Sequence, residues 1–156
     1  MPSLNRSSRL PAFLPAALLV IAALLAPPGP SRAADTGLTV AQITVCRDVD
    51  RAARTAVAPG DTFPADVGRL FCLTRVTGAA DTTAVVHVWV HDGKPRARVR
   101  LPVRSPDWRT WSSKRILPAW TGPWEVMVLD AAGVVLERRA FQVVPAPAAA
   151  TEEETP

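Results

Sequence analysis

Hydrophobic and polar positions alternate along most of the chain after residue 37, which is typical of strands with one buried face. The alternating or β-branched runs are separated by Gly, Pro and Asp positions that favour turns. They cover residues 38–46, 69–77, 84–103, 108–116 and 124–144. Because the third and fifth runs each read as a hairpin, the pattern predicts one all-β domain. We expect a single immunoglobulin-like β-sandwich of about seven antiparallel strands.

The connection over residues 47–68 is polar and is interrupted by Pro59-Gly60 and Pro64. We expect a long loop there, with a short edge strand or a helical turn over Asp48–Ala56. Phe63 is expected to point into the core.

The hairpin over residues 84–103 gives the most detailed prediction. Asp92-Gly93 is a strong signal for a two-residue turn between alternating strands. With that turn, Val88 lies opposite Ala97 and Trp89 lies opposite Arg96. One face is then apolar and is expected to be core, with Val86, Val88, Val90, Ala97, Val99 and Leu101. The other face is a candidate binding surface, with His87, Trp89, Arg96, Arg98 and Arg100.

A tryptophan-rich stretch, 108–124, contains four of the five tryptophans. Residues 108–116 alternate as a strand would, with Trp108 and Trp111 on opposite faces. Part of this strand, with Trp108, Trp111 and Lys114, is expected to extend the candidate surface. The indoles either anchor the core or form an exposed platform beside the cations. The exposure of four of them distinguishes the two cases: Trp89, Trp108, Trp111 and Trp120.

Residues 1–34 have the organisation of a secretory signal peptide. Two arginines precede an apolar region that ends at Ala26, and Ser31-Arg32-Ala33 is a small-residue cleavage site. The uninterrupted apolar run 16–26 is shorter than the ~20 residues of a membrane span. We therefore expect a periplasmic or secreted protein with no stable membrane span after cleavage, the alternative being a retained anchor. The mature chain then comprises the sandwich domain, 35–144, and a disordered Pro/Ala/Glu tail, 145–156.

Cys46 and Cys72 are the only cysteines. In an exported chain, two cysteines on strands expected to be neighbours suggest a disulfide. Two separate buried thiols are the alternative.

The formal charge of the whole chain is +4 at pH 7. Cleavage of the signal leaves 15 cations and 14 acids, which argues against a dedicated nucleic-acid-binding protein. The distribution is more informative than the sum, because Lys94–Arg115 contains eight cations and one acid, Asp107. The expected partner is therefore an envelope protein or an anionic polymer.

Sequence motifs for catalysis are lacking: there is no GxSxG nucleophile turn and no glycine-rich phosphate loop. His87 and His91 are four residues apart on an expected strand, about 13 Å, which is too far for one zinc ion. We therefore predict no enzyme activity, no catalytic residues, no cofactor and no metal site.

Several segments resemble a known family of bacterial proteins. They are FPADVGRLFCLTRVTG (63–78), HVW (87–89), LPVRSPDWRTWSSKRILPAWTGPW (101–124) and the DAAGVVLE hairpin. Together they are similar to the bacterial domain-of-unknown-function family 2914 over roughly residues 46–143. The resemblance implies a small β domain in exported or envelope-associated proteins and brings no catalytic residues.

These observations predict a non-catalytic binding or accessory module of the bacterial envelope that uses an aromatic-basic sheet face. Two alternatives stay open. One is a purely structural appendage domain with no ligand, and the other is a carbohydrate-binding module that uses exposed tryptophans.

The signal peptide gives the first testable prediction. Because the cleavage site follows the apolar region directly, the exported protein should begin at or near Ala34. Mass spectrometry of the periplasmic or secreted form measures this, and an intact 10–26 segment in that form contradicts it.

Overall fold

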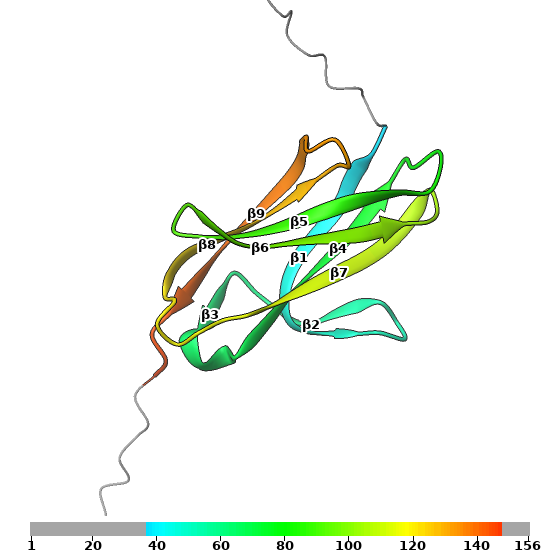
Figure 1. Ribbon diagram of the computed structural model, residues 1–156. Helices are drawn as coiled ribbons and strands as arrows, with labels where there is room; N and C mark the ends of the chain where they lie inside the picture. Colours follow the sequence, from blue (N-terminus) through cyan, green and yellow to red (C-terminus); the bar gives the residue numbers. More distant parts are fainter. Residues whose placement is uncertain (1–36, 148–156) are drawn as a thin grey trace, which may run out of the picture. The chain divides into compact units, whose positions relative to one another are not determined.

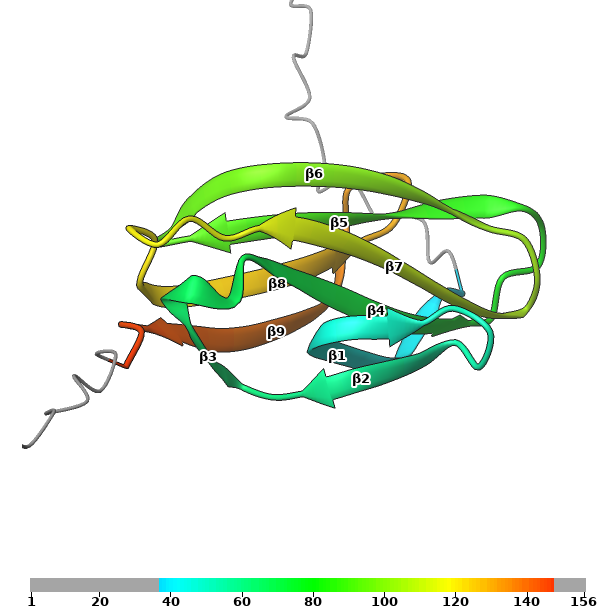
Figure 2. The same ribbon diagram turned by 90° about the horizontal axis from the view of Figure 1, so that it is seen from below.

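The computed structural model describes residues 37–147, so the predicted signal segment and residues 148–156 of the predicted tail lie outside the described residues. The described chain is an all-β structure of two packed sheets (Figures 1 and 2). Sheet A has the order β2-β1-β4-β7 and sheet B has the order β3-β9-β8-β5-β6. The strands of sheet A are β1 (Thr39–Asp50), β2 (Thr55–Pro59), β4 (Arg69–Thr77) and β7 (Asp107–Arg115). Those of sheet B are β3 (Thr62–Pro64), β5 (Thr83–His91), β6 (Lys94–Val103), β8 (Gly122–Leu129) and β9 (Val135–Val144).

The prediction of a β-sandwich is confirmed, whereas the number of strands is higher than expected. Residues 37–147 contain nine strands, and the two short additional ones, β2 and β3, both lie in the connection 47–68. The helical turn over Asp48–Ala56 is wrong, because β1 continues to Asp50 and then turns. The Asp50 carboxylate closes that turn by accepting the backbone N–H groups of Ala52 and Ala53, both at 2.9 Å.

One strand pair departs from the expected antiparallel arrangement, because β3 pairs with β9 in parallel. Phe63, in β3, is buried as predicted, with 2% of its surface exposed. The immunoglobulin-like assignment of the sandwich stays a prediction.

The β5–β6 hairpin turns at Asp92-Gly93 as predicted. Both turn residues have a positive φ, 50° at Asp92 and 70° at Gly93, which a two-residue turn of this type requires. The pairing beyond the turn differs from the prediction. His91 pairs with Lys94 and Val90 with Pro95, but Trp89 then pairs with Ala97, so that Arg96 is an extra residue in β6. Such a β-bulge shifts every later residue of the strand to the other side of the pleat.

Because of the bulge, the side of β5 that faces the main core is the opposite of the side predicted. Ala97, Val99 and Leu101 do face the interior, but they lie opposite Trp89, His87 and Val85. The other predicted core residues of β5, Val86, Val88 and Val90, point to the opposite side of sheet B from the main core. Val88 and Val90 are nevertheless buried there, with 1% and 8% of their surface exposed, in a second small cluster with Met127 and Leu129.

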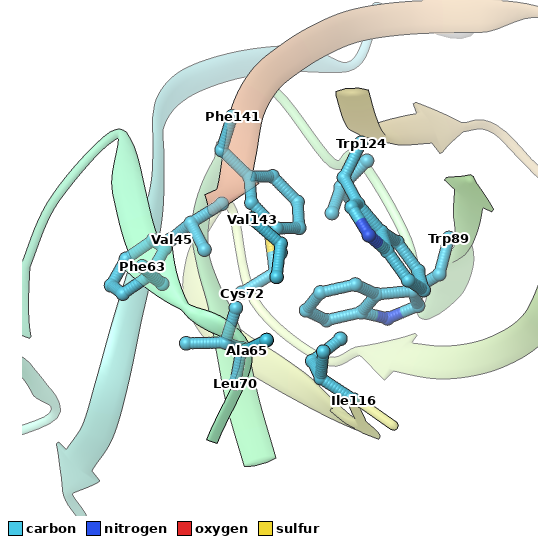
Figure 3. Close-up of a cluster of buried hydrophobic side chains, with 11 residues drawn as sticks. Val45, Phe63, Ala65, Leu70, Cys72, Trp89, Ile116, Trp124, Phe141 and Val143 are labelled. Carbon is cyan, nitrogen blue, oxygen red and sulfur yellow. The ribbon is translucent and has the colours of Figure 1, made fainter. Parts of the chain in front are cut away.

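The main core lies between the sheets and is dominated by aromatic rings (Figure 3). Phe141 stacks on Trp124, with ring centroids 5.9 Å apart, and meets Trp89 edge-on at 6.2 Å. Trp89 and Trp124 are almost fully buried. Because burying an indole removes a large apolar area from water, these rings account for much of the hydrophobic stabilisation of the sandwich.

The outer face of sheet A is covered by its own first hairpin. Val49 of β1 and Ala56 of β2 pack with Leu73 and Trp111, which point outward from β4 and β7. The far end of the β1–β2 hairpin therefore folds over this face of the sheet and brings the turn 51–54 towards β7.

The predicted Cys46–Cys72 disulfide is wrong, and both thiols are free and buried. The reason is the register of β1 with β4: Cys72 pairs with Val45, and Cys46 pairs with Phe71. Adjacent positions on a strand point to opposite faces, so Cys72 lies in the core (Figure 3) and Cys46 lies beneath the β1–β2 hairpin. Burial raises the pKa of Cys72 to about 12 and also raises that of Cys46.

This arrangement predicts two titratable thiols per chain. The denatured, unreduced protein should react with two equivalents of a thiol reagent, whereas the folded protein should react slowly because both sulfur atoms are buried and protonated. Non-reducing electrophoresis is the control for disulfides between chains. A monomer whose thiols appear only after reduction contradicts the register described above.

Candidate functional site

The predicted aromatic-basic face of the β5–β6 hairpin does not exist as one surface. His87 and Trp89 are fully buried between the sheets, whereas Arg98 and Arg100 lie on the outer face of sheet B, opposite Val88 and Val86. The bulge at Arg96 is the cause, because it moves Arg98 and Arg100 away from the side that carries the two rings. Arg98 and Arg100 are therefore separated from the other predicted site residues.

His87 is part of a polar network that crosses the interior. Its Nδ1 lies 2.8 Å from the Ser112 hydroxyl of β7, and its Nε2 lies 3.0 Å from the Thr74 hydroxyl of β4. The Trp89 indole N–H donates to the same Ser112 oxygen at 3.0 Å. The indole N–H can only donate, so the Ser112 oxygen accepts this bond and its own O–H can donate to Nδ1 of His87. His87 then carries its proton on Nε2 and donates it to the Thr74 hydroxyl oxygen. This network joins sheet B to two strands of sheet A.

The network holds His87 in its neutral form. Burial lowers its pKa from 6.5 to about 4, because a charged imidazole is poorly solvated in the interior. His87 is enclosed, with none of its surface exposed, so its role is to connect the sheets.

Arg96 and Lys114, two further predicted residues, meet on an indole. The Arg96 guanidinium lies 5.2 Å and the Lys114 ammonium 5.0 Å from the ring centroid of Trp120, distances typical of cation–π contacts. Arg96 reaches this ring because the bulge turns it away from Arg98. The backbone of Trp120 is held in place, since its carbonyl accepts the Trp124 indole N–H at 3.0 Å. We call Arg96, Lys114 and Trp120 the Trp120 cluster.

Trp108 and Trp111 line a surface pocket of about 270 Å³, which we call the Trp108 pocket. The two residues point to opposite sides of β7, as predicted, and because β7 is an edge strand the pocket wraps around it. The pocket also contains three arginines. Its lining comprises Arg54, Pro102, Arg104, Trp108, Arg109, Thr110 and Trp111.

Arg54 comes from the turn of the β1–β2 hairpin. Its guanidinium lies 5.4 Å from the Trp108 ring centroid, stacked as a cation–π contact. The φ of Arg54 is 53°, which is a left-handed conformation. For a non-glycine residue, that conformation costs roughly 1–2 kcal/mol. The fold therefore holds this arginine over Trp108 in spite of a local backbone cost.

None of the three arginines of the Trp108 pocket forms an ion pair within the described residues. The three ion pairs in that part of the chain are Arg75–Asp107, Arg138–Glu125 and Arg139–Asp61. Asp107, the acid beside the pocket, already accepts two hydrogen bonds from Arg75, one of them at 2.9 Å. Those bonds and, to a smaller extent, the charge of Arg109 lower the pKa of Asp107, so it stays ionised and bound to Arg75.

Sequence reasoning identified Trp108 and Trp111 but missed Arg54, Arg104 and Arg109 as members of the site. Arg104 is adjacent in sequence to the tryptophan-rich stretch, which is a signal that was available. Arg54 lies more than fifty residues before Trp108, and only the folding of the β1–β2 hairpin over sheet A brings the two together. The exposure of the tryptophans is also mixed: Trp89 is buried, and Trp108, Trp111 and Trp120 are half-buried.

The described chain is thus a two-sheet β-sandwich protein with a surface pocket whose three arginines form no ion pair within residues 37–147. Residues 82–143, from β5 to β9, match the model of a family described as protein of unknown function (DUF2914). The resemblance noted in the sequence is confirmed for these residues, and residues 46–81 lie outside the match. No curated protein matches the chain.

Similar solved structures include a β-glucosidase from Kluyveromyces marxianus, with 10% identity and a TM-score of 0.37. The alignment covers 69% of this chain and 14% of that one. An endonuclease/exonuclease/phosphatase from Beutenbergia cavernae has 23% identity and a TM-score of 0.31, with 69% of this chain and 35% of that one covered. The chain therefore spans a minor part of each protein. Within residues 37–147, no helix is long and apolar enough to cross a membrane.

The buried His87 predicts a loss of stability in mild acid. His87 binds a proton near pH 6.5 in the unfolded state and only near pH 4 in the folded state. The contribution of neutral His87 to the free energy of unfolding is therefore fully present above pH 6.5 and decreases as the pH falls towards 4. The slope is at most ~1.4 kcal/mol per pH unit, and the total loss is roughly 3 kcal/mol. Urea unfolding at pH 7.5 and pH 4.5 measures it.

Carboxylates also titrate in this range, so the comparison needs a variant. His87→Gln, which cannot titrate, should show a smaller difference between the two pH values than the parent protein. His91→Gln replaces the other histidine and leaves the hydrogen bonds of His87 to Thr74 and Ser112 intact, so it is the control for the substitution itself. If the free energy of unfolding depends on pH equally in the parent protein and in His87→Gln, the prediction is wrong.

Proposed function

We propose that this protein is a non-catalytic binding module of the bacterial envelope, periplasmic or secreted, that holds an anionic partner in the Trp108 pocket. The observation that carries the proposal is the convergence of Arg54, Arg104 and Arg109 on one pocket without an ion-pair partner among the described residues. Three like charges gathered at one place repel each other, and an anion bound between them removes that repulsion.

The chemistry of the pocket favours carboxylate or phosphate groups. A guanidinium presents N–H donors in its plane and pairs with such groups in a bidentate manner. The Arg54 guanidinium lies over the Trp108 ring, 5.4 Å from its centroid, and this contact restricts its position. This preorganisation reduces the entropy that an arginine loses when it binds a ligand.

The two alternative functions have weaker support. A carbohydrate-binding module needs an open aromatic face for the sugar, but Arg54 covers one face of Trp108, and the ring also packs against the core. A structural appendage does not require cations that lack acidic partners. Export is supported by the sequence of residues 1–34 and by the resemblance to a family of envelope-associated proteins.

The test uses triglutamate, a short linear carboxylate ligand, with the mature protein and isothermal titration calorimetry. Replacing one pocket arginine, in Arg54→Gln or Arg104→Gln, should weaken binding at least tenfold, because a charge-assisted hydrogen bond contributes roughly 1.5–3 kcal/mol. Binding should also weaken as salt is raised, since the pocket is open to solvent.

The matched control is the double variant Arg98→Gln/Arg100→Gln. It removes two charges of the same kind from the outer face of sheet B and should leave triglutamate binding unchanged. Thermal unfolding of each variant checks that the fold is retained. If triglutamate does not bind, or if the control variant weakens binding as much as Arg104→Gln does, the proposal fails.

A further inference from the structure

We infer that the partner is a linear polyanion that lies along the β6–β7 edge of the sandwich, from the Trp108 pocket to the Trp120 cluster. The inference rests on the proposed function of the Trp108 pocket and extends it to a second site. It follows from the position of the two sites, from the uncompensated charge between them and from the composition of the edge.

The Trp120 cluster is a second place where cations gather without acids. Arg96 and Lys114 lie 5.2 and 5.0 Å from one indole centroid, and among the described residues neither forms an ion pair. The Trp120 ring lies against the rings of Trp124 and His91, with centroids 5.9 and 6.1 Å away, and the Trp120 backbone is hydrogen-bonded through both its N–H and its carbonyl. The two cations are therefore presented at a rigid site.

The same two strands supply both sites. β6 is the edge strand of sheet B and β7 is the edge strand of sheet A, and the two are in contact along one side of the sandwich (Figure 2). At one end, the β6–β7 corner provides Arg104 beside Trp108; at the other end, β6 provides Arg96 beside Lys114. Trp108 and Lys114 are six residues apart on β7, which corresponds to about 20 Å.

Charge along this edge has one sign. Four cations of Lys94–Arg115 lie at the two sites: Arg96, Arg104, Arg109 and Lys114. The one acid of this segment, Asp107, is bound by Arg75 of the neighbouring strand β4. A small anion bound at one site leaves the distant site uncompensated. A chain with regularly spaced negative groups neutralises both.

The composition of the edge favours a polymer over a folded acidic protein. Protein interfaces generally have an apolar core from which charged residues are depleted. Here Trp108 at one end and Trp120 at the other each have at least one cation over the ring, and the residues of β7 between them that point inward, Thr110 and Ser112, are buried. The edge therefore presents charge to a partner and little apolar surface.

The experiment compares triglutamate with decaglutamate. At ~3.3–3.6 Å per residue, triglutamate spans about 10 Å and decaglutamate about 33 Å, so only the longer chain reaches both sites. A chain that engages both sites gains affinity through its effective concentration at the second site. Decaglutamate should therefore bind at least tenfold more tightly than triglutamate. Part of any gain comes from the larger number of registers in which a longer peptide can bind at one site, and the variants described below measure the part that depends on the second site. Decaglutamine is the neutral control and should not bind.

The decisive variant is Arg96→Gln/Lys114→Gln. It should reduce decaglutamate affinity at least tenfold and leave triglutamate binding at the Trp108 pocket unchanged. Arg98→Gln/Arg100→Gln, with the same change in charge on the outer face of sheet B, should affect neither ligand. Thermal unfolding checks that each variant keeps its fold.

The outcomes separate the two proposals. If triglutamate binds and depends on Arg54 and Arg104, but Arg96→Gln/Lys114→Gln leaves decaglutamate affinity unchanged, the inference is wrong and the proposed function stands. If neither glutamate peptide binds, both are wrong. If Arg98→Gln/Arg100→Gln weakens decaglutamate binding as much as Arg96→Gln/Lys114→Gln does, the polyanion does not follow the β6–β7 edge and the inference is again wrong.

Discussion

The extra residue in β6 determines which side chains of this sandwich face inward. Pro95 lacks the N–H group that would continue the ladder, and the pairing resumes one residue later, with Ala97 opposite Trp89. Trp89 therefore enters the core, and Arg96 is directed to Trp120 at the end of the sandwich. Without the bulge, either the indole of Trp89 or the apolar residues of β6 would face solvent. The aromatic core and the Trp120 cluster thus depend on one irregularity.

His87, which lies in the interior, requires hydrogen-bond partners from sheet A and so constrains the register of that sheet. Since His87 points inward, its two ring nitrogens need partners across the gap, and Thr74 and Ser112 provide them from neighbouring strands. Cys72 pairs with Ser112 in the β4–β7 ladder, so the register that places the two hydroxyls near His87 also places this thiol in the core. A shift of β7 by one residue would turn both the hydroxyl of Ser112 and the indole of Trp108 to the opposite face.

Local sequence signals predicted the elements well but not the way in which they meet. The strand 69–77 and the Asp92-Gly93 turn were correct because both depend on neighbouring residues. The faces of β5 were wrong because the register assumed no bulge, although Pro95 within a strand was a signal for one. Half of the Trp108 pocket was predictable from the alternation of β7. Arg54 was not predictable, because it reaches the pocket only through the packing of the β1–β2 hairpin on sheet A. The positions of the two thiols were not predictable either, because they depend on the register between β1 and β4.

Cys46 and Cys72 lie about one ladder step apart but on opposite faces of sheet A, beneath different covers. Lifting the β1–β2 hairpin from the sheet exposes the first thiol, whereas the second becomes accessible only when the two sheets separate. Regions of one protein commonly open with different free energies. The chain therefore carries two natural probes of motion, one for the hairpin that bears Arg54 and one for the whole sandwich. Their relative rates of modification distinguish movement at the pocket from unfolding.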